Sequence, residues 1–148
     1  MRPSRVLAVL VMWPVLVAAG CASREGASSG ANETPPLAKL AGVTWTLVSL
    51  NGQPVPQGMR IPTAMFDGAR LAGLGGCNRY SGQIQEQAPG TIAIGPLAST
   101  KMACPPPAMD VEGRYFAILD KVTQYRLAGS RLVLSGPSGE LTFERATL

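Results

Sequence analysis

From residue 40 onward, apolar and polar residues alternate in short runs that are separated by turn residues. The run at residues 44–50 is rich in β-forming side chains, and Asn51-Gly52 follows it directly. Asn-Gly is a strong hairpin signal because both residues tolerate a positive φ angle. Further runs of the same kind lie at residues 64–66, 70–73, 80–85, 91–94, 124–127, 131–134 and 140–144. The pattern predicts seven or eight short strands.

One segment in the C-terminal half follows a helical period instead. Its apolar residues recur at the spacing of a single helix face, namely Val111, Tyr115, Ile118, Leu119 and Val122. Three prolines at residues 105–107 precede the segment, and proline suits the first turn of a helix. We therefore expect one helix near residues 107–123.

Short strands interrupted by one helix are typical of a mainly β domain of the α+β type. Tight meander turns favour closure of the sheet, because closure removes exposed strand edges. Residues 39–148 are therefore predicted to form a small antiparallel β-barrel-like meander of seven or eight strands. The helix is expected to cover one opening of this barrel.

The first twenty residues have the layout of a secretory signal. Arg2 and Arg5 precede an uncharged and mostly apolar run at residues 6–19. This run is shorter than the roughly 20 residues that a membrane-spanning helix needs, and Pro14 removes a backbone donor within it. Residues 1–20 are therefore predicted to be a cleavable leader.

Small residues lead up to a cysteine at the end of this leader, in the order Val17-Ala18-Ala19-Gly20-Cys21. The segment resembles the lipobox of bacterial lipoproteins, which implies a lipid attached to Cys21. Several acyl chains would anchor the protein permanently, since each buried methylene contributes about 0.8 kcal/mol. The alternative is an ordinary signal with an unmodified Cys21. Ala22 is not the aspartate that retains lipoproteins in the inner membrane, so the resemblance implies the periplasmic face of the outer membrane.

Residues 21–38 are mostly small or polar and end in a proline-containing stretch. Such a composition cannot bury enough apolar surface to offset the entropy of ordering. We interpret this segment as a flexible tether between the anchor and the domain. The alternative, an N-terminal strand, is disfavoured because the segment lacks alternation.

Composition excludes several classes of function. The net charge is +4, and two of the thirteen Lys and Arg residues lie in the predicted leader. The rest form no cluster, so we expect no nucleic-acid binding. The chain has no histidine, which excludes Ser/His and Cys/His nucleophiles. The carboxylates fall mostly in predicted turns or on the solvated side of the helix: Asp67, Glu86, Asp110, Glu112, Asp120, Glu140 and Glu144. We expect neither an enzyme nor a cofactor.

Two cysteines, Cys77 and Cys104, remain in the predicted domain. Export to an oxidising compartment favours a disulfide between them. The alternative is a pair of buried thiols packed as small hydrophobic groups. A metal site is disfavoured, because two thiols without histidine fill only half of a tetrahedral shell.

Two stretches of unusual composition stand in a fixed order. The first is Gly75-Gly76-Cys77-Asn78-Arg79-Tyr80-Ser81-Gly82, and the second is Leu97-Ala98-Ser99-Thr100-Lys101-Met102-Ala103-Cys104-Pro105. Together with Trp45-Thr46-Leu47 ahead of the Asn-Gly turn, they closely resemble the META domain family, the DUF306-type family of HslJ-like heat-shock lipoproteins. The resemblance covers residues 43–143, nearly the whole predicted domain.

The resemblance implies a small barrel-like fold, a location in the cell envelope, and a role in stress or antibiotic tolerance, including tolerance of novobiocin. It implies no known ligand or reaction. Two interpretations stay open for the motif residues Asn78, Arg79, Tyr80, Thr100 and Met102. They either hold a tight turn and pack the core, or they form a contact surface.

We therefore expect a non-enzymatic accessory lipoprotein of the outer membrane that stabilises the envelope or binds another envelope protein. The alternative is a lipid-anchored binding module that inhibits a cell-wall lytic enzyme. An enzyme would instead require carboxylates that converge in a pocket with raised pKa values.

Overall fold

The computed structural model describes residues 35–146. The predicted leader, the lipid-attachment residue Cys21 and the predicted tether as far as Thr34 lie outside the described residues. Within residues 35–146, no helix combines the length and the apolar character needed to span a bilayer.

Ten strands and one α-helix make up the described part of the chain. The strands are β1 (Thr44–Leu50), β2 (Gln53–Pro54), β3 (Thr63–Asp67), β4 (Arg70–Leu74), β5 (Arg79–Ala88), β6 (Thr91–Ile94), β7 (Ala98–Ser99), β8 (Gln124–Ala128), β9 (Arg131–Gly136) and β10 (Gly139–Arg145). The helix is α1 (Ala108–Leu119), and a short 3₁₀ helix, η1 (Leu37–Leu40), precedes β1.

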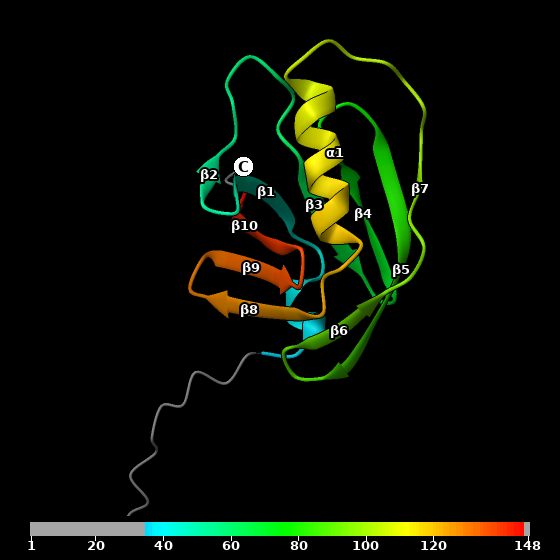
Figure 1. The fold of residues 1–148 in the computed structure, drawn as a ribbon. Helices are drawn as coiled ribbons and strands as arrows, with labels where there is room; N and C mark the ends of the chain where they lie inside the picture. Colours follow the sequence, from blue (N-terminus) through cyan, green and yellow to red (C-terminus); the bar gives the residue numbers. More distant parts are fainter. Residues whose placement is uncertain (1–34, 147–148) are drawn as a thin grey trace, which may run out of the picture. The chain divides into compact units, whose positions relative to one another are not determined.

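Eight of these strands form a closed antiparallel barrel (Figure 1). The order around it is β1, β3, β4, β5, β6, β8, β9, β10, and β10 pairs back with β1 from Trp45 opposite Arg145 to Leu50 opposite Leu141. Strands β2 and β7 extend the sheet from β1 and β5. The predicted mainly β barrel with one helix is confirmed. The two added strands were not expected, because two residues are too few to show an alternation.

The helix predicted near residues 107–123 is present as α1, and all five apolar residues of its predicted stripe are buried. The chain leaves the helix after Leu119, although Val122 remains buried. The Thr123 N–H already donates to the carbonyl of Ser135 in β9, at 3.0 Å. A hydrogen bond to the sheet therefore replaces the next helical bond.

One hydrophobic cluster joins the barrel strands, α1 and η1. Trp45, Phe66, Tyr115 and Phe143 are among its largest fully buried side chains. Residues 35–38, the last four of the predicted tether, belong to the folded domain: Leu37 is buried, and the Tyr125 hydroxyl donates to the Pro35 carbonyl at 2.9 Å.

Gly73 in β4 allows β3 to approach closely. A Cβ atom at this position would lie 2.0 Å from the carbonyl oxygen of Thr63, which also accepts hydrogen bonds from the hydroxyls of Tyr80 and Tyr115. We expect Gly73→Ala to lower the free energy of unfolding by about 2–3 kcal/mol, because overpacking displaces the strand. Urea denaturation measures this loss.

Gly113→Ala in α1 is the matched control, since no atom lies within 4 Å of the added Cβ. It should leave stability unchanged or raise it by up to about 1 kcal/mol through helix propensity. Equal losses in the two variants would contradict the close approach at Gly73.

Candidate functional site

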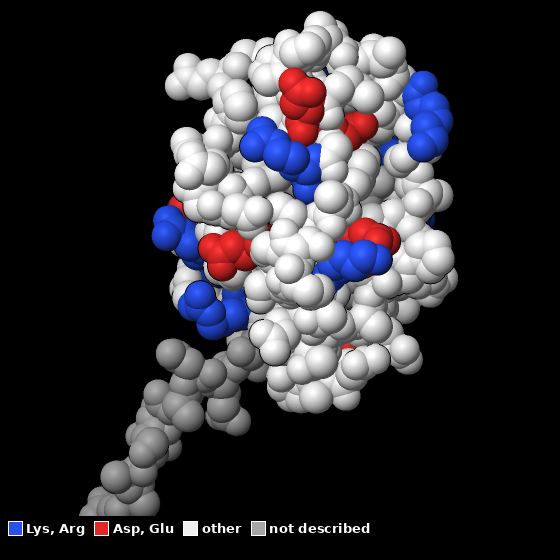
Figure 2. Space-filling view, viewed as in Figure 1, with Lys and Arg blue, Asp and Glu red and all other residues white. Residues whose placement is uncertain are grey.

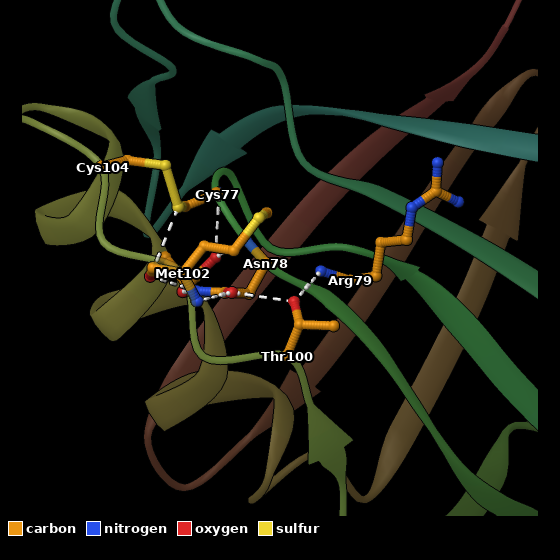
Figure 3. The surroundings of a disulfide bond; sticks show 7 residues. Cys77, Asn78, Arg79, Thr100, Met102 and Cys104 are labelled. Carbon is orange, nitrogen blue, oxygen red and sulfur yellow. Dashed lines mark hydrogen bonds between the residues drawn. A yellow bond between two sulfur atoms is a disulfide. The ribbon is translucent and has the colours of Figure 1, made fainter.

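The two motifs of the sequence meet beside the first turns of α1 (Figure 3). A disulfide joins Cys77 to Cys104, with their Cα atoms 6.0 Å apart. The predicted pairing is therefore present, in place of two free thiols. The bond ties the turn before β5 to the segment that leads into α1.

Asn78 links both motifs through its side-chain amide, which is 3 % exposed. Its Oδ1 accepts from the Thr100 hydroxyl at 2.8 Å and from the Met102 N–H at 2.7 Å (Figure 3). Its Nδ2 donates to the Met102 carbonyl at 3.1 Å and to Oε1 of Glu112 at 2.7 Å. The amide is thus fully engaged in holding the turn against its neighbours.

Glu112 is the buried carboxylate of this cluster, at 5 % exposure. Its Oε2 accepts from the backbone N–H groups of Cys77 and Asn78, at 2.9 and 2.5 Å. Its Oε1 accepts from Nδ2 of Asn78. Both carboxylate oxygens are therefore occupied by charge-assisted hydrogen bonds.

Glu112 was predicted to be among the solvated carboxylates, and this prediction was wrong. The buried face of α1 is wide enough to include position 112 between Ala108 and Tyr115. Gly75 lets the helix approach, because a Cβ there would lie 3.0 Å from Oε2 of Glu112. The paired glycines before Cys77 are the sequence signal that could have revealed this contact.

Burial alone raises the pKa of Glu112, and it is the largest single influence. The hydrogen bonds from Asn78 and Cys77, together with the positive charge of Lys101, outweigh it and lower the pKa below the ordinary 4.5. Glu112 is therefore held ionised at neutral pH. A general acid or base needs a pKa near the operating pH, so this carboxylate is suited to structure rather than proton transfer.

The lowered pKa predicts a specific dependence of stability on pH. Because the folded pKa lies below the unfolded value, ionised Glu112 stabilises the fold above pH 4.5, and this contribution is lost as the pH falls through the folded pKa. The difference in unfolding free energy between wild type and Glu112→Gln should therefore shrink below pH 4.5. Urea denaturation at a series of pH values measures it, and a constant difference would contradict the assignment.

Tyr80 lies in the core, at 3 % exposure, and so belongs to the packing of the barrel. Its hydroxyl lies 2.7 Å from that of Tyr115, and the two rings pack with centroids 5.7 Å apart. Burial raises the pKa of both hydroxyls well above the ordinary 10. Both tyrosines are therefore neutral at physiological pH and pack in the hydrophobic core.

The remaining motif residues divide between structure and surface. The Thr100 hydroxyl accepts from the Arg79 backbone N–H at 3.2 Å, which fixes the start of β5. Figure 3 shows the Arg79 side chain pointing away from the disulfide and from Asn78. The Met102 side chain is also exposed, at 49 %. Arg79 and Met102 are thus the motif residues whose side chains are free to touch a partner.

Within residues 35–146, no three His, Cys, Asp or Glu side chains gather where they could hold a metal ion. Both cysteines of this part of the chain are taken up by the disulfide. The cluster therefore connects the turn before β5, the segment that leads into α1, and α1 itself. We call it the Glu112 joint, and its residues are Cys77, Asn78, Thr100, Met102, Cys104 and Glu112.

Comparison with known proteins gives one family match and several matches to solved structures. The family model described as META domain matches residues 38–147, whereas no curated protein matches. An NMR structure of a protein from Burkholderia xenovorans is similar, with 26 % identity and a TM-score of 0.61 over 75 % of this chain and 86 % of that one. A second NMR structure has 27 % identity and a TM-score of 0.60, over 72 % of this chain and 92 % of the other.

A crystal structure of a DUF4847 family protein from Bacteroides vulgatus shares the fold. Its identity is 17 %, its TM-score is 0.51, and the match covers 74 % of this chain and 96 % of that one. The same small-barrel fold is therefore found in chains whose sequences differ widely.

Proposed function

Since the chain belongs to the META domain family, we propose that it is a non-enzymatic binding domain held at the bacterial cell envelope by a lipid on Cys21. The Glu112 joint carries this proposal. Its carboxylate and amide groups are consumed in hydrogen bonds between segments. The residues that distinguish the motifs thus build a rigid body, which leaves the outer surface for contact with a partner.

The location rests on two independent features of the chain. Residues 1–21 carry the leader and lipobox pattern, and Ala22 favours the outer membrane. The disulfide supports export, because such bonds persist in oxidising compartments outside the cytosol. The proposed place of action is the periplasmic face of the outer membrane.

The family resemblance supplies the proposed physiological role, which is an accessory one in envelope stress and in tolerance of novobiocin-type antibiotics. The partner is another envelope component. A strain that lacks the gene should tolerate less novobiocin, and the wild-type gene should restore tolerance. If a gene carrying Cys21→Ser restored novobiocin tolerance to the wild-type level, the lipid anchor would not be needed for this role.

Mass spectrometry of the protein extracted from bacterial membranes tests the anchor itself. We expect an N-terminus at Cys21 that carries a diacylglyceryl thioether and an N-linked acyl chain. Cys21→Ser is the control and should lose both the lipid mass and the membrane association. An unlipidated chain with the leader still attached would overturn the proposal.

A further inference from the structure

A groove of about 680 Å³ lies on the outer face of β3, β4 and β5, next to β7. Its charged lining residues are all arginines, Arg60, Arg70 and Arg79. On the face of the molecule that carries α1, by contrast, basic and acidic side chains are interspersed (Figure 2). The groove is therefore a local concentration of positive charge on a surface of mixed charge.

Strand register explains why the groove is hollow at its centre. Alternate residues of a strand share one face, so Ala72 of β4 and Ser81 of β5, which lie opposite each other, both face outward. Ala98 of β7 pairs with Ser81 on the other side. These small side chains form a low floor, while Met65 and Leu74 rise beside it.

The same register spaces the charges. Arg79 stands opposite Leu74, whereas Arg70 stands opposite Gln83, four residues further along β5. At about 3.3 Å per residue, the two arginines are offset by about 13 Å along the strands. Arg60 lies in the loop before β3 and also lines the groove. Positive charge thus stands at both ends of an uncharged floor.

Within residues 35–146, no carboxylate forms an ion pair with these arginines. The ion pairs found there are Lys121–Asp120 and Arg131–Glu144, both outside the groove. Asp67 stands opposite Arg70 in the β3–β4 register, but it makes no ion pair with it and does not line the groove. The guanidinium groups are exposed and available to bind anions.

We propose that this groove binds an extended acidic segment of a partner protein, with two carboxylates four residues apart engaging Arg70 and Arg79. The spacing follows from the geometry, because an extended chain also advances about 3.3 Å per residue. Guanidinium groups bind carboxylates in a bidentate manner, and the hydroxyls of Ser81 and Ser99 line the floor where a peptide backbone would run.

A concave site with a recessed floor fits a chain-like ligand better than a flat bilayer surface. The groove proposal rests on the proposed function of the chain as a binding domain, and it adds the chemical nature of the partner. It adds Arg60 and Arg70 to Arg79, which the sequence motif had already singled out.

Fluorescence anisotropy of the full-length chain, purified in neutral detergent, tests the groove. The probe is a dye-labelled synthetic peptide with a β-forming background and two glutamates four residues apart; the control peptide has glutamines instead. We expect binding of the first peptide only, weakened by added salt. Arg70→Gln and Arg79→Gln should each weaken it about tenfold, which corresponds to about 1.4 kcal/mol.

Arg126→Gln is the matched control variant, because Arg126 is an exposed arginine of β8 outside the groove. It should leave binding unchanged, and thermal unfolding should be the same for all three variants. Equal binding of both peptides, equal loss in the control variant, or binding only to anionic phosphatidylglycerol vesicles would overturn the proposal. Mass spectrometry of the same preparation distinguishes failure of the groove proposal from failure of the proposed lipid anchor. A lipidated chain that does not bind the peptide would contradict only the groove proposal. An unlipidated chain that binds the peptide would contradict only the anchor.

Discussion

Replacing Glu112 with alanine is expected to lower the free energy of unfolding by about 3–5 kcal/mol. The substitution removes the acceptor of three buried donors, namely two backbone N–H groups and the Asn78 amide. Each buried donor left without a partner costs about 1–3 kcal/mol, and relaxation of the turn offsets part of the sum. Urea denaturation at neutral pH measures the loss.

Two further variants make this result specific. Glu112→Gln keeps the shape and one oxygen but turns an NH₂ group toward Nδ2 of Asn78, so a loss of about 2 kcal/mol is expected. Asp110→Ala removes an exposed carboxylate from the same helix and should cost less than about 1 kcal/mol. If the Glu112 and Asp110 alanine variants were equally stable, Glu112 would not be a structural anion.

Removing the disulfide is expected to have an effect of similar size. The bond closes a loop with a sequence separation of 27, and the chain-entropy model assigns about 3.5 kcal/mol to such a closure. The Cys77→Ala/Cys104→Ala variant should therefore unfold on the order of 10–20 °C below wild type. Thermal unfolding followed by circular dichroism measures this difference.

Reductant provides the matched control for the disulfide. Wild type in reductant should shift toward the melting temperature of the double-alanine variant, and the variant itself should not respond. Equal melting temperatures of oxidised wild type and variant would show that the closed loop contributes nothing to the stability of the barrel.

Much of the fold could be predicted because strand alternation and hairpin turns are local signals. The strand at residues 44–50 was predicted with its observed bounds, and Asn51 does adopt a positive φ of 49°. The pairing of β1 with β10 joins opposite ends of the domain. Alternation of apolar and polar residues predicts that the sheet closes into a barrel. It does not predict which residues of β1 and β10 lie opposite each other.

The site was harder to predict because its decisive contacts are distant in sequence. Glu112 reaches a turn 34 residues earlier in the chain. Its spacing from Tyr115 and Leu119 places it on the buried face of α1, but only the distant partners show why a carboxylate is tolerated there. The disulfide, by contrast, could be predicted from the number of cysteines in the domain and from the predicted export of the chain. Arg60 and Arg70 were missed, since the groove exists only once three strands are in register.

The most direct test of the Glu112 joint is an NMR titration of the Glu112 side-chain carboxyl carbon in the folded, oxidised protein. We predict a single transition with a pKa below the ordinary 4.5, because three hydrogen bonds hold the carboxylate ionised. A pKa near neutrality would contradict this, and would mark Glu112 as a group poised for proton transfer.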